Sequence, residues 1–163
     1  MSRLIDRGGT VAPHVDIVTA TEDGSRTQTY AETRDRAHQL AFALKDAGIG
    51  VGDRVGTFMW NGSRHLEAYH ATAGMGAVLH TINLRLWESD LEYIINHAGD
   101  RLIIADADVL PILEKLSGRI PTVEKVVVGT ETGFEDWSSS LPEAVDYEAF
   151  IDGKPTRFEW PSI

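Results

Sequence analysis

The side chains of this sequence that could bind a metal or transfer a proton are above all its histidines. The chain has six of them, at His14, His38, His65, His70, His80 and His97. His65 and His70 are the nearest pair, and their spacing places them on different faces of a helix. No His-Glu-x-x-His sequence occurs, so the zinc-binding pattern of metallopeptidases is missing. The histidines therefore predict no metal site, and no catalytic residue is assigned among them.

Glycine-rich turns could bind phosphate through backbone N–H groups if they connected a strand to a following helix. The glycines of segment 48–52 follow a predicted helix and precede a predicted strand, which is the opposite order. Termination of the helix explains these glycines better than phosphate binding does. Gly153 and Lys154 are followed by Pro155 and lack the rest of a P-loop sequence. No cofactor-binding residue can therefore be named from the sequence.

Charge and composition exclude several classes of function. With 15 basic and 25 acidic residues, the formal net charge is -10, which is unsuited to nucleic acid or to an anionic membrane surface. The absence of cysteine removes thiol nucleophiles, thiolate zinc sites and disulfides. No apolar run is long enough to span a membrane, and the first residues lack the apolar core of a secretory signal. We therefore expect a cytoplasmic protein.

The N-terminal part of the chain carries clear signals for a hairpin and a helix. An Asp-Gly step at Asp23 and Gly24 separates two extended runs, which predicts an antiparallel hairpin over residues 16–30. Thr29 and Glu32 have the spacing of a capping box, and apolar residues then recur with helical periodicity. This helix is expected to end at Gly48.

From residue 54 to 129, short branched or apolar runs alternate with helical patterns. We expect strands over 54–60, 78–82, 102–105 and 123–128. Between them, helices are expected over 64–74, up to Gly99, and from an Asp108 cap to Gly118. Such alternation is typical of parallel strands joined by right-handed crossovers. The predicted fold class is therefore α/β, a doubly wound, mostly parallel sheet with an N-terminal antiparallel hairpin.

The composition changes after Gly129. We accordingly predict an α/β subdomain over 1–129, with its parallel core at 54–129, and an irregular segment over 130–163 with one brief helix at 147–151. Phe158 and Trp160 are apolar side chains that should pack against a partner. Their position close to the terminus suggests a chain cut from a longer one.

Several segments resemble, in order and spacing, the start of the acyl-CoA synthetases, within the superfamily of adenylate-forming enzymes. They are Thr29–Glu32, Gly48–Val55, Trp60–Ala68, His80–Leu86 and Asp90–Ala98. The resemblance covers nearly the entire chain, from about residue 4 to 163. The last three of these segments are most similar to the branch that acts on medium-chain and long-chain fatty acids, although short-chain and aryl-acid branches share much of the pattern.

The resemblance implies scaffold roles for five residues of these segments: Trp60, Asn61, Arg64, Asn83 and Arg85. Asn83 and Arg85 would lie on the loop after the second parallel strand, where a buried amide and guanidinium could tie the loop to the sheet. A structural role is favoured for them over substrate contact. Leu84 stands where the family commonly has proline.

The resemblance further implies a parent reaction that joins a carboxylic acid to ATP, releases pyrophosphate and transfers the acyl group from AMP to CoA. ATP, magnesium and CoA would serve the parent, and none of them is expected on this fragment. The phosphate loop, the acid pocket and the C-terminal lysine would all follow residue 163. We therefore expect the N-terminal portion of a fatty acyl-CoA ligase, inactive alone, whose main partner is the remainder of the ligase chain.

Two alternatives stay open. The chain could be a self-standing α/β interaction module that forms homo-oligomers without catalysis, driven by an apolar flank. It could instead belong to another adenylate-forming ligase, such as an aryl-acid–CoA ligase. The acid that is activated would distinguish an aryl-acid ligase from a fatty-acid ligase. A phosphate loop encoded downstream of this segment would distinguish either ligase from the interaction module.

Overall fold

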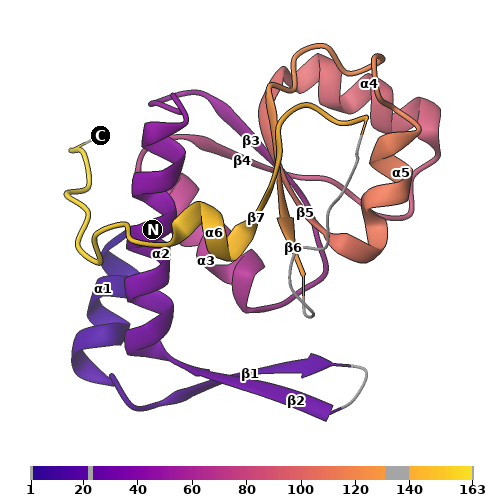
Figure 1. Ribbon diagram of the computed structural model, residues 1–163. Helices are drawn as coiled ribbons and strands as arrows, with labels where there is room; N and C mark the ends of the chain where they lie inside the picture. The colour runs from indigo at the N-terminus through magenta and orange to yellow at the C-terminus, as the bar shows by residue number, and fades with distance from the viewer. Residues whose placement is uncertain (1, 22–23, 131–139, 163) are drawn as a thin grey trace. The chain divides into compact units, whose positions relative to one another are not determined.

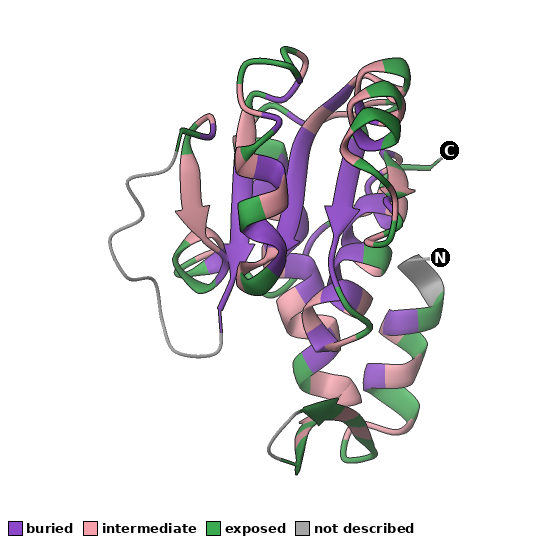
Figure 2. Cartoon of the chain, turned by 90° about the vertical axis from the view of Figure 1, so that its right-hand side faces the viewer, coloured by how far each residue is buried: buried purple, intermediate pink, exposed green. Residues whose placement is uncertain are grey.

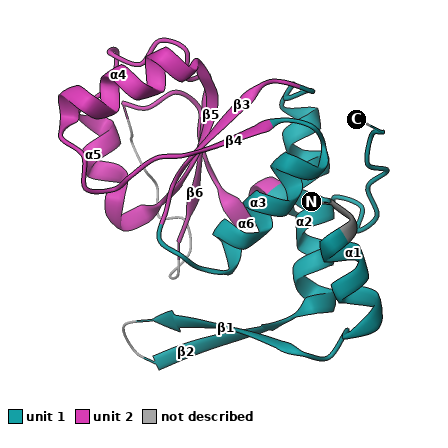
Figure 3. Cartoon of the chain, turned by 180° about the vertical axis from the view of Figure 1, so that it is seen from behind, with its two compact units in different colours: residues 1–51, 60–77, 151–163 teal, residues 52–59, 78–150 magenta. Residues whose placement is uncertain are grey.

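The computed structural model describes residues 2–21, 24–130 and 140–162 of the chain. It has an α/β fold with a parallel sheet and an N-terminal antiparallel hairpin, as predicted (Figure 1). The chain forms two compact units (Figure 3). Unit 1 comprises residues 1–51, 60–77 and 151–163, and unit 2 comprises residues 52–59 and 78–150.

Unit 1 contains the predicted hairpin. Strands β1 (Asp16–Thr21) and β2 (Gly24–Thr29) pair antiparallel, with Val18 opposite Thr27. The remaining residues of the predicted turn, 22–23, lie outside the described residues. Figure 1 shows the two strands as a ribbon that extends away from the helices of this unit.

Helix α2 (Tyr30–Asp46) begins and ends as its sequence predicts. The Thr29 hydroxyl accepts the N–H of Glu32 at 3.2 Å, and the Glu32 carboxylate accepts the N–H of Thr29 at 2.7 Å, so the capping box is complete. Beyond the cap at Ala47, Gly48 adopts a left-handed φ of 82°. The helix buries an apolar face that includes Ala37, Leu40, Ala41 and Leu44.

Helix α1 (Ser2–Val11) was not predicted, because its sequence contains two adjacent glycines, which are poor helix formers. Those glycines let α1 approach α2 closely. A Cβ atom at Gly8 would come within 2.9 Å of the Tyr30 ring, and one at Gly9 within 2.8 Å of the Arg34 side chain. Tertiary packing against α2 thus overrides the weak propensity of α1.

Unit 2 is built on a parallel sheet with strand order β4-β3-β5-β6-β7. The strands are β3 (Arg54–Phe58), β4 (Val78–Thr81), β5 (Asp100–Asp106), β6 (Lys125–Gly129) and β7 (Ala144–Asp146). The first four confirm the predicted strands. Strand β7 lies beyond the predicted core at 54–129 and pairs with β6, with Val145 opposite Val127. Its three residues are too few to show a period in the sequence.

Helices α4 (Glu88–Ala98) and α5 (Leu110–Glu114) pack on one face of this sheet. Leu91 and Ile95 from α4 and Leu110 and Leu113 from α5 join Phe58 in the same buried cluster. Because successive strand residues face opposite ways, alternate residues of β5 and β6 complete this cluster. Figure 2 shows the central strands coloured as buried.

Two further helices complete the description. Helix α3 (Ser63–Gly74) belongs to unit 1, and the brief helix α6 (Tyr147–Ile151) confirms the prediction for residues 147–151. The predicted Asp108 cap is wrong. Asp108 lies inside a 3₁₀ turn (Ala107–Val109), and α5 starts after it without a side-chain cap, with proline in its first turn.

Candidate functional site

The segment after β3 contains the first of the scaffold residues, and it belongs to unit 1. Trp60 is 51% exposed, and its carbonyl accepts a hydrogen bond from Nδ1 of His65 at 3.2 Å. Asn61 is exposed and Arg64 is half-buried. Burial lowers the pKa of His65, whereas the bond to the Trp60 carbonyl acts in the opposite direction. His65 therefore closes the turn that leads into α3 in its neutral form.

The loop after β4 contains Asn83 and Arg85, in unit 2. Both residues are exposed, so the expected burial of their side chains is wrong. The Asn83 side-chain oxygen accepts the backbone N–H of Arg85 at 2.9 Å, which forms a local Asx turn. The loop is instead joined to the sheet by Ile82, which is buried and donates its backbone N–H to the Thr57 carbonyl at 2.9 Å. Asn83 thus shapes the loop through its own backbone.

A histidine–aspartate pair lies on the sheet of unit 2, with the aspartate buried and the histidine partly exposed. His80 Nδ1 on β4 lies 2.7 Å from Oδ2 of Asp100 on β5, across the intervening strand β3. The space between them exists because β3 has Gly56 there, where a Cβ would meet Asp100 Oδ2 at 3.3 Å. Desolvation raises the pKa of Asp100, while His80 and Arg54 counteract it. The other oxygen of Asp100, Oδ1, is buried and has no hydrogen-bond partner in the described part of the chain.

This pair resembles the orienting half of a catalytic dyad, in which an aspartate holds an imidazole in one tautomer. A dyad also needs a nucleophile or substrate at the second ring nitrogen. In the described ranges no nucleophilic side chain is hydrogen-bonded to His80. The pair therefore links β4 to β5 across the intervening strand β3. Sequence reasoning missed it because the two residues are distant along the chain and give no local pattern.

A second buried set joins three elements of unit 1. The Glu67 carboxylate on α3 is fully buried and accepts hydrogen bonds from Arg36 Nε on α2 at 2.8 Å and from Gln28 Nε2 on β2 at 2.9 Å. A paired, hydrogen-bonded carboxylate of this kind is structural rather than reactive.

Neither a metal site nor a membrane span is formed by the described part of the chain. Over residues 2–21, 24–130 and 140–162, no three His, Asp or Glu side chains are grouped so that they could hold a metal ion. No helix in the same ranges is long and apolar enough to cross a membrane.

The fold is α/β with a parallel sheet, and comparison with known proteins identifies the family. Residues 9–158 match the family described as AMP-binding enzyme, so the chain belongs to that family. The family relationship confirms the resemblance seen in the sequence.

Relatives with curated activities include several acid–CoA ligases. The chain is 38% identical over 163 residues to 3-methylmercaptopropionyl-CoA ligase of Ruegeria lacuscaerulensis, covering 99% of this chain and 30% of the relative. It is 40% identical over 147 residues to long-chain-fatty-acid–CoA ligase of Thermus thermophilus, covering 88% and 27%. The chain thus spans less than one third of the length of these relatives.

Solved structures share the fold. The anthranilate CoA ligase AuaEII in complex with anthranoyl-AMP has a TM-score of 0.81 at 23% identity, covering 98% of this chain and 28% of that structure. Coronafacic acid ligase from Pectobacterium brasiliense has the same TM-score of 0.81 at 19% identity, covering 98% and 30%. At this level of identity, the likeness establishes the fold only.

Proposed function

We propose that this chain is the N-terminal portion of an AMP-forming acid–CoA ligase and that it supplies scaffold rather than catalytic groups. The observation that carries the proposal is the family match over residues 9–158, combined with relatives of which the chain covers 30% or less. The main partner would be the remainder of the ligase chain. Because ATP and CoA are cytoplasmic substrates, we place the whole enzyme in the cytoplasm.

The proposed parent reaction has two steps. The carboxylate of an acid attacks the α-phosphorus of ATP, giving acyl-AMP and pyrophosphate, and the CoA thiol then displaces AMP to form the thioester. The described residues do not fit Mg–ATP, because they include neither a set of metal ligands nor a glycine-rich loop between a strand and a helix. Hence no step is assigned to a residue of this chain.

The scaffold roles proposed for five residues rest on their positions. Trp60 and Asn61 lie in the loop after β3, Arg64 lies in the first turn of α3, and Asn83 and Arg85 lie in the loop after β4. In open parallel sheets, ligand sites form outside the carboxyl ends of the strands. We infer that these residues give the two loops their shape and that other parts of the ligase supply the contacts to the substrate.

For the acid, we propose a medium-chain or long-chain fatty acid. The supporting relatives are the Thermus thermophilus enzyme and the medium-chain-fatty-acid–CoA ligase of Ectopseudomonas oleovorans, at 35% identity over 149 residues. A second candidate is a short thioether acid, because 3-methylmercaptopropionyl-CoA ligases match at 38% and 36% identity. Aryl acids are less favoured, since 3-hydroxybenzoate–CoA/4-hydroxybenzoate–CoA ligase of Thauera aromatica is 29% identical.

The first experiment is the intact mass of the native polypeptide that carries this segment, isolated with an antibody. A product several times larger than 17.9 kDa is expected. That product should then form AMP in the presence of ATP, CoA and decanoate, palmitate, 3-methylthiopropionate or benzoate, each offered separately. A product near 17.9 kDa would favour the interaction module instead.

If the chain is instead a self-standing interaction module, we propose that it forms a homo-oligomer. Light scattering of the 163-residue chain at high concentration tests it. A native short product that forms a stable oligomer, with no activity toward any of the four acids, would replace the ligase proposal. A large product with acid-dependent AMP formation would exclude the module.

A further inference from the structure

The final described segment of the chain, residues 152–162, lies across the helices of unit 1; we call it the C-terminal strap. Phe158 packs edge-on against Phe42 of α2, with ring centroids 4.9 Å apart. Trp160 covers Gly74 of α3, where a Cβ atom would come within 2.6 Å of the indole ring. Phe158 and Trp160 therefore find the expected packing partners within their own unit.

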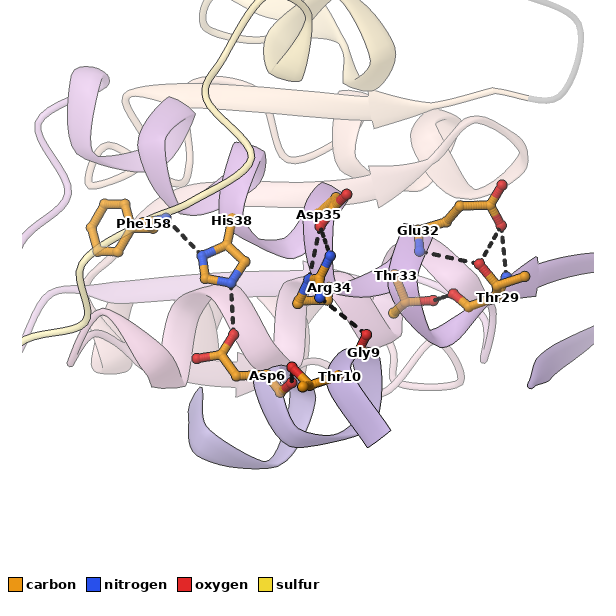
Figure 4. A network of polar contacts seen from close by, with 10 residues as sticks. All are labelled: Asp6, Gly9, Thr10, Thr29, Glu32, Thr33, Arg34, Asp35, His38 and Phe158. Atoms are coloured by element: carbon orange, nitrogen blue, oxygen red, sulfur yellow. Dashed lines mark hydrogen bonds and ion pairs between the residues drawn. The ribbon is translucent and has the colours of Figure 1, made fainter. Parts of the chain in front are cut away.

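His38 of α2 joins the strap to α1. Its side chain is only 5% exposed, and both ring nitrogens have hydrogen-bond partners (Figure 4). Nδ1 lies 2.7 Å from the backbone nitrogen of Phe158, and Nε2 lies 2.7 Å from Oδ1 of Asp6. The second Asp6 oxygen accepts the indole N–H of Trp160 at 2.9 Å. One imidazole thus connects α1, α2 and the strap.

The partners of His38 determine its tautomer. A backbone N–H can only donate, so Nδ1 must accept from Phe158 and cannot carry a proton. The proton of the neutral ring is therefore on Nε2, where it is donated to Asp6. A second proton can only be added at Nδ1, and there it would point directly at the Phe158 N–H.

We propose that His38 is a pH-sensitive latch and that its protonation releases the C-terminal strap at Phe158. The imidazolium keeps its hydrogen bond to Asp6, which becomes an ion pair, so the ring stays in place while its acceptor at Nδ1 is lost. The strap then loses one of its polar anchors. The Phe158 side chain keeps its apolar contacts, but its backbone N–H must then hydrogen-bond to water or stay without an acceptor.

Other charged or titratable groups face the latch from each element that packs there. On α1 the group is Asp6, and on α2 Lys45 lies 6.0 Å from the Phe158 ring centroid. On α3 the pKa of His70 is lowered by burial and then by the N-terminal charge, and the Asp6 carboxylate counteracts both. On the strap, Arg157 and Glu159 are exposed. His38 is the group in direct contact with the Phe158 amide.

Other anchors of the strap do not involve His38. Gln39 Nε2 donates to the Lys154 carbonyl at 3.2 Å, and Lys154 Nζ pairs with Asp46 at 2.8 Å. These contacts hold the start of the strap. The bond from the Trp160 indole N–H to Asp6 holds the strap beyond Phe158, so opening should be confined to the Phe158 amide. The inference concerns the fold of this chain and does not depend on ligase activity.

The test is backbone hydrogen exchange of the 163-residue chain, resolved at the Phe158 amide and corrected for the intrinsic effect of pH. Loss of one neutral hydrogen bond corresponds to a fall in protection of roughly fivefold to tenfold. We expect that fall when protection measured at about pH 5 is compared with protection measured at about pH 7.5. The Val127 amide, within the sheet of unit 2, is the internal reference. Unchanged protection of Phe158 over this range would overturn the proposal.

The diagnostic variant is His38→Asn, because an asparagine oxygen can replace Nδ1 as an acceptor but does not titrate. We expect its Phe158 protection to be independent of pH, whereas the control His97→Asn should behave like the wild type. A pH-dependent loss that persists in His38→Asn would assign the effect to another group, such as His70, and reject the latch. If that variant does not fold, nitrogen NMR of the wild-type imidazole decides: Nδ1 protonated at pH 7.5 would contradict the tautomer.

Discussion

Glu67 and Arg36 form an ion pair of 2.8 Å in which the carboxylate is fully buried and the guanidinium side chain is 26% exposed. Gln28 donates a second hydrogen bond to the same carboxylate oxygen. Removing a carboxylate from water costs several kcal/mol unless it is paired and hydrogen-bonded. The position of α3 in unit 1 therefore depends on side chains from both α2 and β2.

Replacing Glu67 by alanine should lower the free energy of unfolding by about 3 kcal/mol, since it leaves Arg36 partly buried without this partner. Glu67→Gln should cost less, because its amide oxygen can still accept from Gln28. Urea unfolding followed by circular dichroism measures both. The control is Asp46→Asn, whose side chain is 60% exposed in its pair with Lys154 and should contribute less than about 1 kcal/mol. Equal effects at Glu67 and Asp46 would contradict this assignment.

Gly74 should not tolerate a side chain, because the Trp160 ring occupies the place of its Cβ. We expect Gly74→Ala to cost about 1–3 kcal/mol from overpacking, despite the better helix propensity of alanine. The clash should be relieved when Trp160 is replaced by leucine, so the two substitutions should be non-additive in a double-mutant cycle. Gly62→Ala is the control, since its Cβ would meet Thr19 at an ordinary 3.5 Å. Additive effects would mean that Trp160 does not restrict position 74.

Much of the fold follows from local sequence signals, and the elements that were missed lack them. The Thr29 capping box, Gly48 and the branched run of β6 each act within a few residues, so the sequence predicts the elements they define. Helix α1 depends instead on how closely Gly8 and Gly9 let it approach α2. Strand β7 depends on pairing with β6. Neither contact has a local signature.

The same distinction applies to the candidate sites. The sequence predicts where Asn83 lies, on the loop after β4, but not that its side chain turns back to the Arg85 amide. His38 and Asp6 are bonded across two helices, and His80 and Asp100 across a strand. No spacing rule connects such pairs, because their proximity is set by helix packing and by the strand order of the sheet. Only the tertiary structure identifies them.

The raised pKa of Asp100 makes a prediction for stability against pH. Between the ordinary aspartate pKa of 3.8 and the raised native pKa, the folded chain binds more protons than the unfolded chain. The free energy of unfolding should therefore fall as pH rises through this window, and the penalty should be fully present above the raised pKa.

Asp100→Asn removes this titration while it keeps an oxygen that can accept from His80. Its stability relative to the wild type should therefore increase as pH rises from about 4 toward 7, the range above the ordinary value. Urea unfolding at a series of pH values measures the difference, with the exposed Asp90→Asn on α4 as the control. A difference that stays constant or decreases with pH would show that the His80 contact outweighs desolvation.

The last prediction concerns nucleotide binding by the chain alone. ATP binding needs backbone or side-chain donors that surround phosphates, and the described residues provide scaffold loops shaped by Asn83 and by the His65–Trp60 bond instead. We therefore expect isothermal titration of the 163-residue chain with Mg–ATP to give no saturable heat up to millimolar nucleotide. The native full-length product, titrated in parallel, should bind. Saturable micromolar binding by the short chain would mean that this unit has phosphate contacts of its own, whereas absence of binding by both would count against the ligase proposal itself.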